Sequence, residues 1–552
     1  NRELAGQVLG FIGSDGYGLG GVEYTFDRVL RGENGWSILQ KDGLNKRYSR
    51  IGMPQKLPVP GADVYLTIDM HVQKVVEAIL RQTVEQAQAR GGMAMVMNPH
   101  TGDIVAMANV PGFNPNLAGR YTLQQRLNRC IAYNYEPGST FKVLTAASAM
   151  QQGQIGIHDS LDANQGIYEI YDERIRDVVP RGVLSFADAV SYSSNVCFAK
   201  IAARLGEQQL FRYAKDFGLG AQAGIALPGE ESGIVHPISQ WSGRTLVTMA
   251  IGQEVSVTLL QMMLAFSAVA NDGVLLVPRV CDKIVAANGQ TKEMEKGQKV
   301  RRIMQPSVAR ELREVLRGVV DYGTAKSAQI PGITIGGKTG TGQKFDQDSG
   351  SYSHDNVWAS FIGFAPVDKP EFVCGIVIDE PRDGKGGGEI AAPAFRKIVT
   401  KIISHPRLQY AERILDRPVE DKAAMSSDNE SRIVPDVCGL SRDSAAHILK
   451  AEQIPFEIIG DEKEIAHQRP VAGGGMARGR ALILYTASTE NQKETVVPDC
   501  IGKDLRDAIN AINLEGLIPT VQGAGTVTRQ LPSVGKIVRT GVRCTLFCSY
   551  EG

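Results

Sequence analysis

The sequence predicts an α+β fold in which helices pack against an antiparallel sheet. Three observations lead to this prediction. A β-hairpin pattern lies before residue 110, a mostly helical pattern fills residues 139–330, and strand patterns return after residue 330. Strands on either side of a helical region can complete one sheet. A chain of 552 residues is also too long for one ordinary core, so we expect several domains.

Composition narrows the class of function. Sixty basic and sixty acidic residues leave no net charge, and no basic run interleaves with aromatic residues, so nothing supports nucleic-acid binding. No apolar run approaches the roughly 18 residues that cross a bilayer, and no signal peptide is visible. The chain starts at Asn1 rather than at a methionine, so we expect it to be part of a longer protein.

Cysteine and histidine placement gives no metal-site pattern. The eight cysteines and eight histidines are scattered without a C-x-x-C pair, so we expect no metal and no cofactor. Cys544 and Cys548 share one face of a predicted terminal strand. A disulfide and two buried free thiols are both compatible with that spacing, and we favour free thiols.

The first elements belong to two domains. Residues 1–60 are Gly-rich with short strand-like pieces such as Val8–Gly13, and they look like the remainder of a domain. Residues 61–410 form the predicted α+β domain. It opens with a strand at 63–69, a helix at 71–90 and a hairpin at 92–107, each assigned from its apolar spacing.

The rest of this domain alternates between the two classes of element. Residues 185–205 and 258–271 carry the clearest helical patterns. Three strands are predicted at 334–337, 357–364 and 372–378, and a last helix at 393–404. These strands would complete the sheet that the hairpin begins.

The C-terminal part repeats itself. Residues 411–432 form a polar linker. Beyond it, a Val-Pro-Asp triplet and a helical pattern occur twice, with Pro435 and Pro498 63 residues apart. We therefore predict two copies of one small strand–helix–strand module, at 433–488 and 496–551. We expect them to be independent modules that do not stack into a solenoid.

The stretch Glu136–Lys142 is the first candidate for chemistry. A Pro-Gly turn brings Ser139 to the start of an apolar helix, and Lys142 follows on the same face, so their side chains can meet. A lysine on a helix that is apolar all round is rare unless it is paired or functional. The alternative is an N-capping serine beside a lysine that reaches solvent.

Two further motifs complete a serine site. Ser193-Ser194-Asn195 lies in the helical region, where its alternative is a polar patch inside a helix, and Lys338-Thr339-Gly340-Thr341 follows a short strand. Ser-x-x-Lys, Ser-x-Asn and Lys-Thr-Gly together are the signature of penicillin-binding proteins and serine β-lactamases. Each motif alone is weak, but all three in this order are a strong signal.

Each predicted residue has a physical role. Ser139 is the nucleophile and needs a base, which Lys142 can be only if burial and the like charge of Lys338 lower its pKa toward roughly 7–8. Ser193 can pass a proton to the leaving amine. Asn195 can hydrogen-bond the substrate backbone.

The strand motif supplies the substrate contacts. The Thr339 and Thr341 hydroxyls, with Lys338, suit a substrate carboxylate, and Gly340 lets the strand approach the substrate. The backbone N–H groups of Ser139 and Thr341 would form the oxyanion hole. Residues 332–339 also fit a phosphate-binding loop, but the β-branched residues there and the absence of a following helical pattern argue against it.

With these motifs, the chain resembles a class B penicillin-binding protein, a monofunctional peptidoglycan transpeptidase of the division or sporulation type. Gly18–Glu23, Leu66–Asp69, Ala250–Gln253 and Val257–Gln261 resemble further family segments. The resemblance implies that residues 1–60 are the remnant of a non-catalytic domain, that 61–410 is the transpeptidase domain, and that the repeats are PASTA modules.

The resemblance also implies a reaction and a setting. Stem peptides ending in D-Ala-D-Ala would acylate Ser139 before cross-linking, and β-lactams would acylate the same serine. The family implies a single-pass membrane anchor outside this chain, a catalytic domain on the extracytoplasmic face, and membrane-embedded cell-wall synthesis or division proteins as partners. The rival functions are a non-enzymatic penicillin- or cell-wall-binding receptor, a D,D-carboxypeptidase and a β-lactamase.

Overall fold

The computed structural model forms two compact units, which we describe separately. It describes residues 3–404 apart from 42, 45, 49–53, 171–172, 347–350 and 383–384. It also describes residues 431–549 apart from 460–462, 470–474, 478–481, 488–493, 504–507, 509–510, 513–514, 516, 524–525 and 540–541. The predicted linker at 411–432 lies almost wholly outside the described residues.

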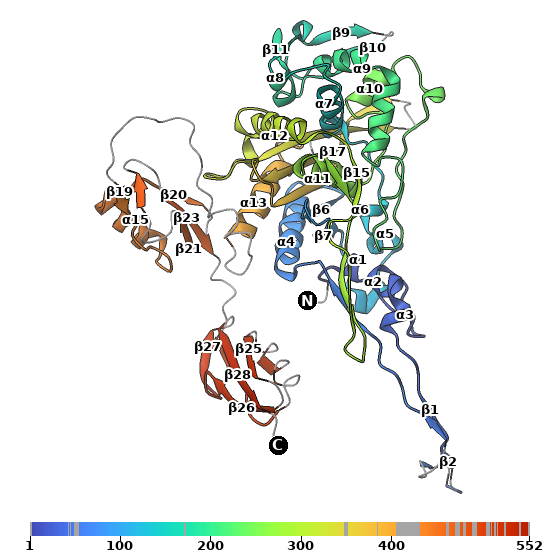
Figure 1. The fold of residues 1–552 in the computed structure, drawn as a ribbon, viewed down its shortest axis with the longest axis vertical. Helices are drawn as coiled ribbons and strands as arrows, with labels where there is room; N and C mark the ends of the chain where they lie inside the picture. The colour runs from blue at the N-terminus through green and yellow to red at the C-terminus, as the bar shows by residue number, and fades with distance from the viewer. Residues whose placement is uncertain are drawn as a thin grey trace. The chain divides into compact units, whose positions relative to one another are not determined.

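A five-stranded antiparallel sheet is the centre of the first unit (Figure 1). Its strand order is β16-β17-β18-β6-β7, so strands from both ends of the domain complete one sheet, and the α+β prediction is confirmed. The strands are β6 (Gly91–Met97), β7 (Ile104–Val110), β16 (Gly336–Asp346), β17 (Ser351–Ala365) and β18 (Phe372–Asp379). Every residue of β6 and β18 is buried, because helices cover both faces.

Three helices cover this sheet. α4 (Met70–Gln86) and α13 (Ala391–Ile403) pack together on one face, and α11 (Leu259–Ala270) packs on the other. α4 ends before the predicted residue 90 because Gln88 adopts a left-handed φ of 47° and the chain turns there. Asp69 caps its start by accepting from two backbone N–H groups.

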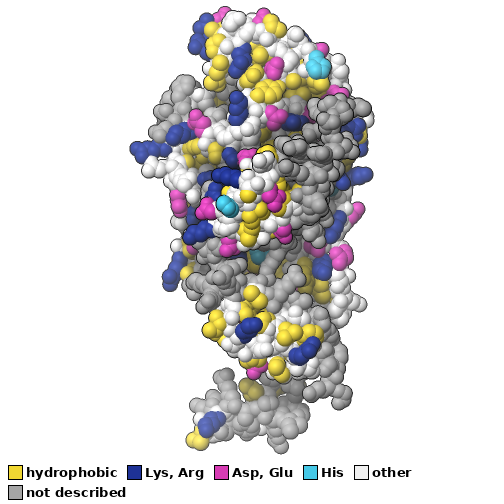
Figure 2. Space-filling view, turned by 90° about the vertical axis from the view of Figure 1, so that its left-hand side faces the viewer, with side chains coloured by type: hydrophobic (Ala, Val, Ile, Leu, Met, Phe, Trp, Pro, Cys, Tyr) yellow, Lys and Arg dark blue, Asp and Glu magenta, His cyan; other side chains and the backbone are white. Residues whose placement is uncertain are grey.

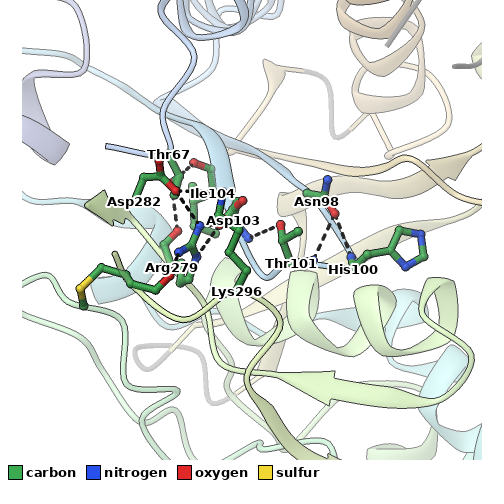
Figure 3. Close-up of polar contacts among 10 residues, drawn as sticks. Thr67, Asn98, His100, Thr101, Asp103, Ile104, Arg279, Asp282 and Lys296 are labelled. Carbon is green, nitrogen blue, oxygen red and sulfur yellow. Dashed lines mark hydrogen bonds and ion pairs between the residues drawn. The ribbon is translucent and has the colours of Figure 1, made fainter. Parts of the chain in front are cut away.

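The predicted strand at 63–69 is shorter and joins a different sheet. β5 (Asp63–Leu66) pairs with β13 (Cys281–Val285) rather than with the central strands. The buried Arg279 bonds Asp103 at 2.6 Å and Asp282 at 3.2 Å, and this cluster ties the small sheet to the β6–β7 turn (Figure 3). It is a structural link between two sheets.

Residues 139–330 contain more short strands than predicted. Two small hairpin-like pairs, β8 with β11 and β9 with β10, lie among the helices, so the expectation of a mostly helical region is only partly right. Their bounds are β8 (Ser160–Asp162), β9 (Ile167–Ile170), β10 (Glu173–Arg176) and β11 (Val183–Ser185). The helices are α7 (Lys142–Gln151), α8 (Phe186–Ser191), α9 (Asn195–Asp216), α10 (Thr245–Ala250) and α12 (Pro306–Asp321).

The predicted continuous helix at 185–205 is wrong. It is divided into α8 and α9 by a turn at Ser193, whose φ is +60°. Ser194 then caps α9 by accepting from the N–H of Cys197 at 3.1 Å. A residue with positive φ cannot continue a right-handed helix, and a serine favours the N-cap position, so the motif lies at a helix start.

The N-terminal segment also differs from expectation. The strand-like piece at Val8–Gly13 overlaps a short helix, α1 (Gly6–Leu9). The other elements of the first unit are α2 (Gly21–Thr25), α3 (Asp27–Leu30), β1 (Trp36–Ser37), β2 (Gln40–Lys41), β3 (Arg47–Tyr48), β4 (Gln55–Lys56), η1 (Pro115–Arg120), α5 (Leu123–Arg126), α6 (Arg129–Ala132), η2 (Gly138–Thr140), η3 (Asn164–Gly166), η4 (Ile238–Gln240), β12 (Val274–Leu276), β14 (Thr291–Glu293), β15 (Lys299–Arg302) and η5 (Lys326–Ala328).

The second unit contains two segments with one topology. In each, a three-stranded sheet has a central strand that runs parallel to one neighbour and antiparallel to the other. The first has α15 (Arg442–Ala451), β20 (Phe456–Ile459), β21 (Glu464–Arg469) and β23 (Leu482–Ala487), with β19 (Ser431–Ile433) paired to β22 (Gly475–Ala477). The second has β25 (Ile518–Gly523), β26 (Thr526–Leu531) and β28 (Arg543–Ser549), with β24 (Glu494–Val496) paired to β27 (Ile537–Arg539).

Each segment also has its own apolar core. The helical pattern of the second repeat, at 503–513, lies mostly outside the described residues. Cys544 is a buried free thiol in the second core, whereas the side chain of Cys548 lies outside the described part of the structure.

Three further findings concern surface charge, metal binding and membrane-spanning helices. On the face in Figure 2, basic and acidic side chains of the described residues are interspersed and form no patch of one sign. Within the described ranges, no group of three or more His, Cys, Asp or Glu side chains could hold a metal ion. No helix among those residues has the length and apolarity to cross a membrane.

Candidate active site

Ser139 lies in a tight turn between the sheet and α7. It is half-buried on the 3-10 turn η2, which one residue, Phe141, separates from α7. Gly138 has a φ of +53°, and its N–H donates to the carbonyl of Gly252 at 3.0 Å. A side chain at Gly138 would be strained by that φ and would meet Thr341 O at 2.9 Å. The turn therefore presents Ser139 beside β16.

Lys142 is fully buried and bonds the Ser193–Asn195 turn. Its Nζ donates to the carbonyl of Ser193 and to Oδ1 of Asn195, each at 2.6 Å. Nζ also lies 3.2 Å from Ser193 Oγ. The sequence predicted that Lys142 meets Ser139, whereas the hydrogen bonds that the structure describes for its Nζ go to the second motif.

Burial lowers the pKa of Lys142 to about 7, although Asp177 and Cys197 act in the opposite direction. Burial also lowers the pKa of Lys338 well below its ordinary value, and the charge of Lys142 lowers it further. The sequence-based expectation named burial and the like charge of Lys338 as the two causes that lower the pKa of Lys142. Burial is the largest cause at Lys142, and the like-charge effect falls on Lys338.

Ser193 Oγ joins the two lysines. Lys338 Nζ donates to it at 2.9 Å from the side of the sheet, while Lys142 Nζ approaches from α7. The turn that carries Ser193 is held by Asp177, which accepts from Ser194 Oγ at 2.7 Å and from the N–H of Val196 at 3.0 Å. A hydroxyl between two amines can pass a proton from one to the other.

Asn195 is fixed on both ends of its amide group. Its Oδ1 accepts from Lys142, and its Nδ2 donates to the carbonyl of Arg176 at 2.7 Å. A primary amide has two N–H bonds, so one remains for a ligand. This supports the predicted substrate-backbone contact.

Lys338 to Thr341 lie inside the edge strand β16, not at the start of a helix. This excludes the phosphate-loop geometry. Thr341 is exposed, whereas the buried Thr339 shares a 2.7 Å hydrogen bond with Thr324. Gly340 lets the strand touch the serine turn, because a Cβ there would lie 2.8 Å from Pro137 O.

Sequence reasoning missed three contributors. Asp177 and Thr324 carry no local signal, because their roles arise only from tertiary contacts. The glycine run Gly386–Gly388 was visible in the sequence and could have been noticed. Its backbone packs on β16: Gly387 N donates to Thr341 Oγ1 at 3.4 Å, and a Cβ there would lie 2.6 Å from Gly340 O.

The arrangement suits acyl transfer. Two buried amines with lowered pKa values share one bridging hydroxyl, and the half-buried Ser139 lies on the turn before the helix that carries Lys142. No charged carboxylate is hydrogen-bonded to either Nζ among the described contacts, so burial is free to favour the neutral amines.

Comparison with protein families gives two matches. The model of the penicillin binding protein transpeptidase domain matches residues 92–400, and the PASTA domain model matches residues 495–549. The family matches therefore span the serine motif, the Ser193–Asn195 turn, β16 and the second C-terminal segment.

Relatives of the whole chain are also found. Penicillin-binding protein PbpB of Mycolicibacterium smegmatis is 34% identical over 72% of this chain and 63% of its own length. Stage V sporulation protein D of Bacillus subtilis is 32% identical over 88% of this chain and 75% of its own length. The chain thus spans less than two thirds of PbpB.

A solved structure shares the fold. It is penicillin binding protein 3 of Mycobacterium tuberculosis complexed with ampicillin, which is 33% identical and has a TM-score of 0.66. The match covers 74% of this chain and 88% of that chain.

Proposed function

We propose that this chain, which belongs to the penicillin-binding protein transpeptidase family, cross-links peptidoglycan stem peptides through an acyl-Ser139 intermediate. The observation that carries the proposal is the Lys142–Ser193–Lys338 cluster, in which one hydroxyl lies within 3.2 Å and 2.9 Å of two buried amines. A relative's name, the probable peptidoglycan D,D-transpeptidase PenA of Neisseria meningitidis, supports the same substrate class.

Acylation begins with proton removal from Ser139. A neutral Lys142 has two N–H bonds and one lone pair, and its two 2.6 Å contacts use the N–H bonds. The lone pair is then left to take the Ser139 proton while Oγ attacks the carbonyl carbon of the penultimate D-Ala. The N–H groups of Ser139 and Thr341 stabilise the oxyanion, at roughly 3–4 kcal/mol for each donor.

Collapse of this intermediate breaks the peptide bond. The leaving D-Ala amine receives a proton through Ser193, which Lys142 and Lys338 contact, and the acyl group stays on Ser139. An amine from a second stem peptide then attacks the ester. Its proton returns by the same groups, a new peptide bond forms, and Ser139 is restored.

The substrate carboxylate belongs beside β16. Thr341 offers an exposed hydroxyl there, and Lys338 adds positive character when it is protonated. Thr339 contributes through its bond to Thr324, which orients its hydroxyl. The free N–H of Asn195 binds the substrate backbone.

The setting follows from the substrate. Peptidoglycan synthesis places the catalytic unit on the extracytoplasmic face, with a membrane anchor and cell-wall synthesis or division proteins as partners of the longer protein. The PASTA segments either bind a wall ligand or stabilise the catalytic unit.

Labelling with a fluorescent penicillin and mapping of the modified residue test the proposal. We expect a stable adduct on Ser139 that is absent from Ser139→Ala. An adduct on another residue would overturn the assignment. Rapid release of hydrolysed drug would favour a β-lactamase, and release of D-Ala to water without cross-linking would favour a carboxypeptidase. Unchanged function of Ser139→Ala in cells would favour a receptor.

A further inference from the structure

The carboxyl group of Glu136 joins three segments next to Ser139. Its Oε1 accepts a hydrogen bond from the backbone N–H of Glu254 at 3.0 Å and from the hydroxyl of Tyr352 at 3.1 Å. Glu254 lies in the loop that follows α10, and Tyr352 lies on β17. One carboxyl group therefore connects the serine turn to a loop and to the sheet.

The same segments also meet through their backbones. Tyr135 and Val257 exchange two hydrogen bonds of 2.9 Å, and Gly138 N donates to Gly252 O at 3.0 Å. On the other side, a Cβ at Gly342 would lie 2.4 Å from Glu136 O. The turn is thus held between the loop and β16.

The second carboxyl oxygen of Glu136 has no matching partner. Oε2 is buried and makes no hydrogen bond among the described residues. Burial raises the pKa of Glu136 to about 7, against the effects of the Tyr352 hydroxyl and the Glu254 N–H. The groups that face this carboxyl are Tyr352 from β17 and the Glu254 carboxylate from the loop, which is paired with Arg244 at 3.0 Å.

We propose that Glu136 is a positioning residue for Ser139, whose ionised carboxylate fastens the serine turn to Tyr352 and to the Glu254 loop, and whose protonation loosens this junction. A charged acceptor makes hydrogen bonds that are about twice as strong as those of a neutral one. The inference rests on the proposed acylation of Ser139.

The test is the pH dependence of acylation by a fluorescent penicillin in the full chain, from about pH 5.5 to pH 8.5. If only Lys142 must lose a proton, the rate rises about tenfold for each pH unit on the acid side. With Glu136 coupled to Ser139, the wild type rises more steeply than this. Glu136→Gln keeps an acceptor oxygen but cannot ionise. On the acid side of its pH profile, the acylation rate should therefore rise only about tenfold for each pH unit, and at high pH the rate should be about fivefold lower than that of the wild type.

Two more variants make the result specific. Tyr352→Phe removes a hydrogen-bond donor to the ionised Glu136 carboxylate, so the steep part of the pH–rate profile should move to higher pH. Glu77→Gln is the matched control: Glu77 on α4 accepts from Ala5 N at 2.7 Å and Gln73 Nε2 at 2.8 Å, and burial raises its pKa, but it bonds no residue of the serine turn. Its acylation profile should equal that of the wild type.

Equal steepness in the wild type and Glu136→Gln would overturn the inference, as would an effect no larger than that of Glu77→Gln. Thermal melting checks that each variant folds. If Glu136→Gln does not fold, a Tyr352→Phe variant whose pH–rate profile matches that of the wild type overturns the inference. A wild type that is never labelled on Ser139 would instead reject the proposed function.

Discussion

At the residue scale, Lys142 shows how a fold produces a base. The helix buries the amine, and the Ser193–Asn195 turn supplies two acceptors at 2.6 Å without supplying a negative charge. Burial lowers its pKa to about 7, so the amine is neutral above that pH and protonated below it. Acylation should therefore decrease as the pH falls through about 7.

Lys142→Arg tests this role. A guanidinium stays charged at all accessible pH values, so it cannot take the Ser139 proton, and we expect acylation to slow by about 10²–10⁴-fold. The measurement is the second-order rate constant with a penicillin. Lys200→Arg is the control, because Lys200 on α9 bonds the Asp162 carbonyl at 2.6 Å and touches no motif residue. A Lys142→Arg variant with the wild-type rate would contradict the assignment.

The sequence could predict the motif residues but not the residues that hydrogen-bond them and hold them in place. Ser139, Lys142 and Lys338 are recognisable because acyl transfer requires these residue types in this order. Asp177, which follows β10, accepts a hydrogen bond from the Ser193–Asn195 turn. Thr324, which follows α12, shares a hydrogen bond with Thr339. Neither contact has a sequence spacing that indicates it.

At the element scale, the break between α8 and α9 was not predicted because the apolar pattern runs through it. Apolar spacing reports which side of the chain is buried, whereas the break depends on the positive φ of Ser193 and on the cap at Ser194. The Ser194 side chain that forms the cap in turn donates to Asp177, which directly follows β10. Local propensity therefore could not locate it.

Asp177 offers a test of this junction. Asp177→Ala removes acceptors for Ser194 Oγ and Val196 N, so we expect the free energy of unfolding to fall by about 1–3 kcal/mol. Asp177→Asn keeps much of the bonding but removes a charge that raises the pKa of Lys142, so its acid limb should move to lower pH. Denaturant melts and acylation profiles measure the two effects. An acid limb that moves to higher pH in Asp177→Asn would contradict the argument.

Close packing of β16 on the serine turn gives another prediction. Gly340→Ala would bring a Cβ to 2.4 Å from Ser360 Oγ and 2.8 Å from Pro137 O, and the carbonyl cannot move without the turn. We expect the strand to shift from Ser139 and acylation to fall by about tenfold or more, since small misplacements of reacting groups cost up to about 10²-fold. Gly119→Ala, which meets nothing within 4 Å, is the matched control. Equal rates for the two variants would show that the contact is unimportant.

At the scale of the whole molecule, most of the central sheet was predictable because β6, β7, β17 and β18 carry apolar patterns. The hairpin β6–β7 and the strands β17 and β18 lie close to their predicted places, whereas the strand predicted at 334–337 covers only Gly336 and Gly337 of β16, which is poor in apolar residues. The pairing of β5 with β13 was not predictable, because short strands contain too little pattern to select a partner. The buried Arg279 cluster, a tertiary feature, fixes that small sheet instead.

The division into two compact units predicts that the catalytic unit works without the C-terminal one. The described residues of the first unit, within 3–403, contain the central sheet and every predicted site residue, and the two C-terminal segments have apolar cores of their own. A chain that ends at Glu420 should therefore keep its melting transition and acylate Ser139 within about twofold of the full-length rate, because a compact unit with its own core can fold alone. Calorimetry of the full chain, of 1–420 and of 421–552 measures this. The two fragments should reproduce the transitions of the intact protein, whereas a lost transition or slow acylation in 1–420 would show that the C-terminal segments stabilise the catalytic unit.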